Sequence, residues 1–565
     1  MSLLKGAPFR LPRLKPYVPD PGDPPIFWFN GEREDVIRDV TRRAVEKHGI
    51  DRAHFEYVLN ELAYNEVRRL ETQRGDEARE QLPFWRGLVR RIARMSDEEK
   101  RATLRTLAER MARDVAGNFD PRVYRIAIRM VPRVLSGVMS PRSLPLQAIA
   151  PNGGKLDELV RCEGTTEKLR KLAKIGTLVF VPTHVSNLDS VVLGYVLERE
   201  GLPPVVYGAG KNLFSNPVMS FFMHNLGAYR VDRRIKATLY KDVLKSYAGV
   251  MVERGYHSLF FPGGTRSRSG LIERHLKLGL AGSAVEAFAR NQVRGQKRPI
   301  LFVPTTINYA LVLEAETLVE DWLKEAGKAR YIIEDDESTR YERWLDFLRR
   351  ISGMEGACTI RFGEPLDPFG NEVDDDGRSL TPHGKPIDPA TYVSRGGKPI
   401  VDTARDVAYT TALGEKLPER YLRETVLMST QLVAHVLFRK LVRATPSIDL
   451  FGRIRHRGDV AMLREDLVRS VGEARDRLLA LESDGVLRVS RILRAEPPDR
   501  IVERALDVWN GYHAKTAAKE SALEITIEEP ELLLYYQNRL VPFATRIASE
   551  ADASAAREIA RIGGS

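Results

Sequence analysis

Cysteine is almost absent from this chain of 565 residues, where Cys162 and Cys358 are the only two. They lie far apart and outside any spacing typical of zinc ligands, so the sequence supports neither a disulfide framework nor a zinc site. Long apolar runs are also missing: no stretch of about 18 uninterrupted apolar residues occurs, and we expect no helix that spans a bilayer. Prolines and basic residues interrupt the first 25 positions, which argues against a signal peptide.

Basic residues are in excess. The chain has a formal net charge of +11 and 43% hydrophobic residues, enough apolar material to fill the cores of two or three domains. The excess charge indicates an anionic partner, which is nucleic acid, an acidic lipid surface or a phosphorylated substrate. No recognised nucleic-acid-binding module occurs, so we expect no nucleic acid partner.

Composition divides the chain into four regions. Residues 1–31 are rich in proline and predict an extended arm. Residues 32–150 predict a helical N-terminal domain, with helices near Glu34–Lys47, His54–Thr72, Asp97–Arg113 and Pro121–Leu135. We assign 151–402 to an α/β domain with a loop insertion at 366–402 rich in Gly, Pro and Asp, and 403–565 to a helical C-terminal region.

Short β-branched or aromatic runs alternate with helical stretches in the α/β region. The runs read TLVFVP, VVYGAG, SLFFP, ILFVP and CTIRF. Such alternation is typical of a layered α/β structure, so we expect a central mixed sheet flanked by helices.

The first candidate chemical group follows the run TLVFVP. His184 stands just after this expected strand, and Asp189 stands five residues later, where a helix begins. A turn between them brings the carboxylate to the imidazole, which holds one tautomer and stabilises the charged form. Alone, this spacing is equally typical of a helix N-cap, because Asp is favoured there.

A second candidate lies in the segment YHSLFFPGGTRSRSG, residues 256–270. The glycines allow backbone N–H groups to approach a phosphate, and Arg266 and Arg268 supply forked, charged donors. Alone, the segment also reads as an ordinary basic turn on a solvated face.

With these residues in place, the sequence resembles the glycerolipid acyltransferases, whose four ordered blocks are all present. The first block is His184 to Asp189, and the second is YGAGKNLFSNPVMSFFMHNLGAYRVDRR, which ends in Arg233 and Arg234. Its AG-x-NL portion is similar to the glycerol-3-phosphate and dihydroxyacetone-phosphate branch. The segment ELLLYYQNRLVPFA, residues 531–544, also resembles the C-terminal YY-x-N segment of the glycerol-3-phosphate branch.

The third and fourth blocks complete the resemblance. FPGGTRSRSG resembles the family's FPEGTRSR and is followed by Lys277 in a Lys-x-Gly pattern. LFVPTTINYALVLE matches the fourth block at Pro304, Ile307, Tyr309 and Glu314. The chain departs from the family at Gly263, where the third block carries Glu. Asp232 and Glu273 are the nearest acids that can compensate for this missing carboxylate.

The resemblance implies transfer of a fatty acyl group from acyl-CoA or acyl carrier protein to the hydroxyl of glycerol-3-phosphate in phospholipid biosynthesis. It implies that His184 is the general base and that Asp189 orients it. The implied acceptor site contains Arg233, Arg234, Gly264, Thr265, Arg266, Ser267, Arg268 and Lys277.

The same resemblance implies no metal and no cofactor. It suggests a peripheral protein on an anionic membrane surface, at the cytoplasmic face. Dihydroxyacetone phosphate and lysophosphatidate are alternative acceptors. A catalytically silent lipid-binding homologue is an alternative from a different class.

Overall fold

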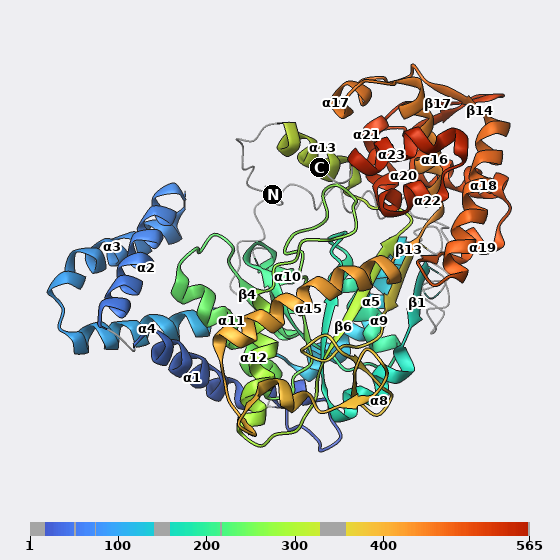
Figure 1. Ribbon diagram of the computed structural model, residues 1–565. Coiled ribbons are helices and arrows are strands. Elements are labelled where there is room, and N and C mark those ends of the chain that lie inside the picture. The colour runs from blue at the N-terminus through green and yellow to red at the C-terminus, as the bar shows by residue number, and fades with distance from the viewer. Residues whose placement is uncertain are drawn as a thin grey trace.

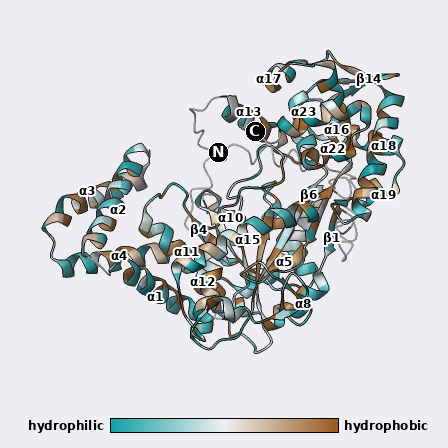
Figure 2. Cartoon of the chain, in the orientation of Figure 1, coloured by the Kyte–Doolittle hydropathy of each residue, from teal (hydrophilic) through white to brown (hydrophobic). Residues whose placement is uncertain are grey.

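The computed structural model describes residues 17–49, 52–73, 75–139, 157, 159–214, 217–327 and 357–562. N-terminal helices lie at one side of the molecule and C-terminal helices at the other, with the central sheet between them (Figure 1). The central strands consist mainly of apolar residues, whereas the surrounding helices alternate apolar and polar residues along their length (Figure 2). The helices that flank the sheet therefore turn an apolar face toward it.

The central sheet has seven strands in the order β1-β7-β6-β2-β5-β3-β4. β7 pairs antiparallel with β6, and the other neighbours pair parallel, so the sheet is mixed as expected. Every residue of β2 and β6 is buried, which explains their continuous apolar sequences. The strands are β1 (Val160–Gly164), β2 (Thr177–Pro182), β3 (Val206–Gly210), β4 (Ala228–Val231), β5 (Ser258–Leu259), β6 (Ile300–Tyr309) and β7 (Cys358–Phe362).

Helices connect these strands and confirm the expected α/β class. α11 packs against α12, and α12 packs in turn against the long helix that follows the insertion. The connecting helices are α8 (Thr166–Ile175), α9 (Asp189–Arg199), η4 (Lys211–Phe214), α10 (Pro217–Asn225), α11 (Thr238–Glu253), α12 (Gly279–Val293) and α13 (Ala315–Gly327).

The N-terminal helices share a second apolar core with α11. The four helices expected from the sequence are present, and α3 is an additional one. They are η1 (Pro25–Trp28), α1 (Phe29–His48), α2 (Arg52–Thr72), α3 (Asp76–Arg91), η2 (Ile92–Arg94), α4 (Asp97–Val115) and α5 (Pro121–Met139). Arg43 of α1 donates two hydrogen bonds to the buried carboxylate of Glu253, at 2.6 and 2.7 Å, which fixes α1 to α11.

The expected proline-rich arm is described only from residue 17. Its described part includes η1 and the start of α1, and Ile26 and Phe27 are buried in the N-terminal core. Residues 1–16 lie outside the described residues.

The segment 366–402 contains more regular structure than the loop expected there. Positive φ angles at Gly377 (81°) and Gly384 (74°) allow tight reversals between short antiparallel strands. Phe369 stacks on Tyr392 with ring centroids 4.5 Å apart and anchors the segment. Its elements are β8 (Glu372–Val373), β9 (Ser379–Leu380), β10 (Pro386–Ile387), η6 (Pro389–Val393), β11 (Ser394–Arg395) and β12 (Lys398–Pro399).

The C-terminal region is mainly helical, as expected, but it also contains a small sheet in the order β14-β17-β16. α16 is buried along nearly its whole length, and α18, α20, α21 and α23 pack around it. The elements are α15 (Thr403–Glu424), β13 (Val426–Leu427), α16 (Ser429–Ala444), α17 (Leu450–Arg453), β14 (Ala461–Leu463), α18 (Arg464–Ser483), β15 (Arg488–Val489), α19 (Arg491–Ala495), α20 (Pro498–Tyr512), β16 (Ala518–Glu520), β17 (Glu524–Ile527), α21 (Pro530–Gln537), η7 (Asn538–Phe543), α22 (Ala544–Ile547), η8 (Glu550–Asp552) and α23 (Ala553–Ile562).

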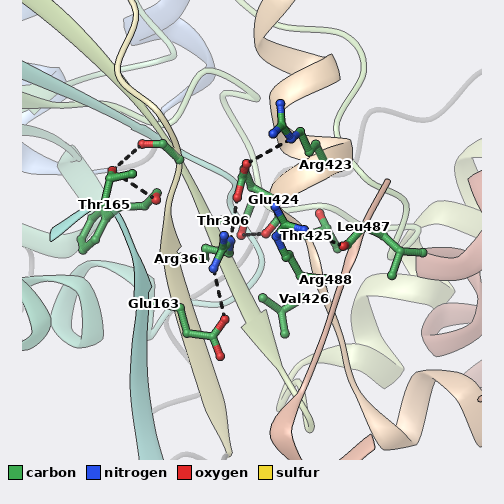
Figure 3. A network of polar contacts seen from close by, with 12 residues as sticks. Glu163, Thr165, Thr306, Arg361, Arg423, Glu424, Thr425, Val426, Leu487 and Arg488 are labelled. Atoms are coloured by element: carbon green, nitrogen blue, oxygen red, sulfur yellow. Dashed lines mark hydrogen bonds and ion pairs between the residues drawn. The ribbon is translucent and has the colours of Figure 1, made fainter. Parts of the chain in front are cut away.

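A polar network joins the end of α15 to the sheet (Figure 3). Arg361 of β7 donates from Nε to Glu424 over 2.6 Å and from Nη1 to Glu163 of β1 over 3.3 Å. The Thr306 hydroxyl of β6 donates to the Glu424 carbonyl over 2.7 Å. One helix end is therefore fixed to three neighbouring strands.

Candidate functional site

His184 and Asp189 face each other across the turn between β2 and α9. His184 Nδ1 lies 2.8 Å from Asp189 Oδ2, and the Asp189 side chain is fully buried. The same oxygen accepts hydrogen bonds from the backbone N–H groups of Val185 (2.7 Å) and Ser186 (3.1 Å). Asp189 is the first residue of α9, where the helix dipole also stabilises negative charge. The turn closes around one carboxylate, as its spacing in the sequence predicts.

The second oxygen of Asp189 is held by a distant residue. The hydroxyl of Tyr309, at the end of β6, donates to Asp189 Oδ1 over 2.9 Å. Burial raises the pKa of Tyr309 further above its ordinary range, so this hydroxyl stays a donor. Both carboxylate oxygens are therefore fixed, and the carboxylate holds the imidazole through Nδ1 in a single orientation.

Two further contacts hold His184, one at its ring and one at its backbone. The Phe261 ring stacks on it with centroids 4.2 Å apart. Glu273 accepts a hydrogen bond from the His184 backbone N–H over 2.7 Å. The side chain remains 18% exposed, and in the described part of the chain no group is bonded to Nε2. This nitrogen is thus available to take a proton from a substrate hydroxyl.

The glycine-rich loop 263–270 lies against this dyad. The backbone N–H of Ser267 donates to the His184 carbonyl over 2.8 Å. Gly264 has a φ of 76°, and a Cβ atom there would lie 2.6 Å from Lys277 Cδ and 2.9 Å from its Nζ. Lys277 therefore lies directly over Gly264, and only glycine leaves room for it. Thr265, at the tip of the same loop, is exposed.

The two arginines of the loop have different environments. Arg266 is buried and pairs with Glu314 at 3.3 Å. Arg268 is 41% exposed and pairs with Glu325 of α13 at 2.9 Å. Because an exposed pair contributes about 1 kcal/mol or less, Arg268 can exchange its carboxylate for a phosphate at little cost.

Glu314, which follows β6, joins the dyad turn to the arginine loop. Besides Arg266, it accepts hydrogen bonds from the Ser186 hydroxyl and the Asn187 backbone N–H, each over 3.0 Å. The sequence suggested Glu314 only as a block match, and the structure assigns it this bridging contact.

The basic residues of the second block lie after β4. Arg234 donates two hydrogen bonds to Asp232, both at 3.0 Å, while Arg233 is exposed. The direct contacts of the dyad run to the third and fourth blocks, whereas these bonds stay within one turn. Binding of a substrate by Arg233 and Arg234 stays a prediction, as do the roles of the other site residues.

The C-terminal segment also reaches the site. Asn538 Nδ2 donates to the Ser269 carbonyl over 2.8 Å, and a Cβ atom on Gly270 would lie 2.0 Å from the Tyr535 carbonyl oxygen. A small pocket beside the dyad turn is lined by residues that include Val185, Gly270, Tyr309, Gln431, Tyr535 and Arg539. The stretch YYQNR was visible in the sequence, but nothing in its spacing indicated this contact.

Neither a metal-binding cluster nor a membrane-spanning helix occurs among the described residues. No group of three or more His, Cys, Asp or Glu side chains in those residues is arranged to hold a metal ion. No helix within the described ranges combines the length and apolar character needed to cross a membrane.

Part of the chain is similar to known proteins. Residues 163–308 match the family model described as Acyltransferase. A solved structure described as the 1-acyl-sn-glycerophosphate (LPA) acyltransferase PlsC from Thermotoga maritima matches with 20% identity and a TM-score of 0.23. That match covers 39% of this chain and 66% of the other, just under two thirds of its length.

Proposed function

We propose that this chain, whose residues 163–308 match the family model described as Acyltransferase, moves a fatty acyl group from acyl-CoA or acyl carrier protein to the hydroxyl of glycerol-3-phosphate. The supporting observation is the 2.8 Å contact of His184 Nδ1 with Asp189 beside an arginine-bearing loop. Ser267 of that loop donates a backbone hydrogen bond to the His184 carbonyl. A base and a phosphate-binding loop side by side are what transfer to a phosphorylated alcohol requires. The product belongs to phospholipid biosynthesis.

In the proposed reaction, His184 Nε2 takes the proton of the acceptor hydroxyl as its oxygen attacks the thioester carbonyl. Asp189 stabilises the imidazolium that forms and keeps the ring in place. The tetrahedral intermediate collapses when the C–S bond breaks. The leaving thiolate takes the proton back from His184, and the products are an ester and a free thiol.

The acceptor phosphate is proposed to bind the loop opposite His184. The positive charge that binds the phosphate comes from Arg266, Arg268 and Lys277. Gly264, Thr265 and Ser267 belong to the loop that carries the two arginines, and Lys277 lies over Gly264. Arg233 and Arg234, in the turn after β4, are proposed to extend this basic surface. Fixing the phosphate makes the attack of the hydroxyl effectively intramolecular.

Membrane association at the cytoplasmic face is part of the proposal. Ile126 and Met130 of α5 are about half exposed, and Phe221 of the adjoining α10 is 37% exposed. Arg125 and Arg129 are exposed next to them on α5. Apolar side chains flanked by arginines suit the interface of an anionic bilayer, where a peripheral protein inserts shallowly.

The test is transfer of radiolabelled acyl groups from acyl-CoA and acyl carrier protein, in anionic liposomes, to three acceptors: glycerol-3-phosphate, dihydroxyacetone phosphate and lysophosphatidate. His184→Ala is expected to lower kcat on glycerol-3-phosphate by ~10²- to 10⁴-fold. His275→Ala removes an exposed histidine of the neighbouring segment and is the matched control. Turnover of another acceptor reassigns the substrate, and no turnover with any pair indicates the silent lipid-binding homologue.

A further inference from the structure

Gly263 and Glu273 share one volume at the base of the arginine-bearing loop. A Cβ atom on Gly263 would lie 2.8 Å from both Cδ and Oε2 of Glu273, and 3.0 Å from Oε1. Non-bonded carbon atoms normally stay ~3.5–4.0 Å apart, so a side chain at position 263 would collide with this carboxyl group. The carboxyl group of Glu273 therefore fills the place where a side chain at 263 would begin.

The reach of a glutamate makes this coincidence meaningful. In any glutamate, Cδ lies two single bonds beyond Cβ, a span of about 2.5 Å. Cδ of Glu273 lies 2.8 Å from the Cβ position of residue 263. A glutamate at either position can thus bring its carboxyl group to nearly the same point. The resembled acyltransferases carry glutamate at the first of these positions, and this chain carries it at the second.

The carboxyl group of Glu273 contacts the dyad directly. Its Oε1 accepts the hydrogen bond from the His184 backbone N–H at 2.7 Å. Its Oε2 exposes less than 1 Å² and has no hydrogen-bond partner among the described residues. A buried oxygen that loses contact with water and gains no hydrogen-bond partner destabilises the folded state. Burial at this point is therefore unfavourable for folding, which indicates that the group is there for another reason.

The other nearby acid, Asp232, is already engaged. Its carboxylate accepts two hydrogen bonds from Arg234 at 3.0 Å, and Lys211 Nζ lies 3.8 Å away. It makes none of the contacts that Glu273 makes with His184. Of the two acids that the sequence offered, only Glu273 occupies the place of the missing side chain.

We infer that Glu273 is a positioning residue for the acyl transfer. From the loop that precedes α12, it supplies the carboxyl group that the resembled family carries at the position of Gly263. Through Oε1 it fixes the backbone of His184, and through its bulk it sets the distance between the dyad turn and the Gly263–Gly264 backbone. This inference rests on the proposed function, because its main readout is the rate of transfer.

The test moves the carboxyl group from one position to the other. Four proteins are compared with wild type: Glu273→Ala, Glu273→Gln, Gly263→Glu, and the double variant Gly263→Glu/Glu273→Ala. Glu286→Ala is the matched control, because Glu286 pairs with Arg290 on the exposed face of α12. Thermal melting shows which variants fold, and kcat and the acceptor KM are measured for each.

Glu273→Ala is expected to lower kcat by ~10- to 100-fold, because His184 loses its productive position. KM is expected to change little, because the acceptor still binds. Glu273→Gln keeps an acceptor oxygen for the His184 N–H and is expected to retain most of the activity. Gly263→Glu alone is expected to lose activity, and the double variant to recover most of it. Unchanged kcat in Glu273→Ala, or a folded double variant no better than Glu273→Ala, would overturn the inference.

A second readout separates this inference from the proposed function. In the same proteins, the rate at which diethylpyrocarbonate modifies His184 is followed by mass spectrometry of its peptide. The rate is expected to change in Glu273→Ala and to return to the wild-type value in the double variant. If wild type transfers no acyl group, the proposed function fails, and the modification rates still decide whether Glu273 positions His184. Equal rates in all proteins contradict it.

Discussion

The hydroxyl of Tyr309 donates a hydrogen bond over 2.9 Å to the oxygen of Asp189 that His184 leaves free. Tyr309→Phe removes this donor and leaves a buried carboxylate oxygen unsatisfied, at a cost of about 1–3 kcal/mol. We expect part of this free energy to destabilise the imidazolium form of His184, which lowers kcat about tenfold. We expect this loss in steady-state assays.

The control for this substitution is Tyr247→Phe. The hydroxyl of Tyr247 is also buried, but it accepts a hydrogen bond from the Gly117 backbone in the N-terminal core. This variant is expected to keep the wild-type kcat. Equal losses in both variants would indicate a general effect of removing a buried hydroxyl.

Stability should depend on pH through Glu273. Burial raises the pKa of this carboxyl group from the ordinary value of 4.5 to about 7. Between these values the unfolded chain releases a proton that the folded chain keeps, so stability falls as pH rises and is fully reduced above about pH 7. Glu273→Gln has no such proton.

Relative to wild type, the stability of Glu273→Gln is therefore expected to rise by up to about 3 kcal/mol between pH 4.5 and pH 7. The measurement is Tm of both proteins from pH 5 to pH 8. A difference in Tm that stays constant across this range would show that Glu273 ionises in the folded chain as it does in water.

Arg361 should be a stability residue, because it neutralises Glu424 at the junction of α15 with the sheet (Figure 3). Glu424 is 6% exposed, and Arg361→Met leaves its buried charge facing the half-exposed Arg423 at 3.8 Å, at a cost of about 3 kcal/mol. We expect a clear drop in Tm, which the double variant Arg361→Met/Glu424→Leu largely reverses.

The control for this pair is Arg378→Met. Arg378 pairs with Asp374 and Asp376 but is 63% exposed, and pairs that are screened by water contribute little to stability. Its Tm is expected to stay near that of wild type. An equal drop in both variants would assign the effect to lost packing of arginine.

Membrane association should depend on the exposed apolar residues of α5. Ile126→Gln/Met130→Gln removes two side chains that can enter the acyl boundary, each giving up about 1.5 kcal/mol or more of apolar burial. We expect weaker sedimentation with anionic liposomes. Val407→Gln, at a 60% exposed site on α15, is the control. Equal sedimentation of all three proteins would place the membrane contact elsewhere.

Most of the fold could be predicted from local sequence patterns. β2 and β6 are buried on both faces, so their apolar sequences could be read directly as central strands. The bounds of α3 within the expected helical domain could not be predicted, because Pro83 and Gly87 lie inside it and both usually break helices. The C-terminal β14, β16 and β17 have three or four residues each, too few to show an alternating pattern.

Spacing alone could predict contacts in the candidate site only between residues that are close in sequence. His184 and Asp189 are five residues apart, and a turn suffices to bring them together. The contacts that hold them come from Glu273, Tyr309 and Glu314, which are 89 to 128 residues from their partners. Spacing says nothing about such pairs, because the order of strands in the sheet decides them.

The hydrogen bond between Asn538 and the Ser269 carbonyl also sets an order in time. During translation, Ser269 is made 269 residues before Asn538. At about 5–20 residues per second, the loop that carries Arg266 exists for roughly 15 to 50 s before the side chain that bonds it has been synthesised. A nascent chain thus holds residues 163–308 complete, while the residue that bonds one wall of the candidate site has not yet been added.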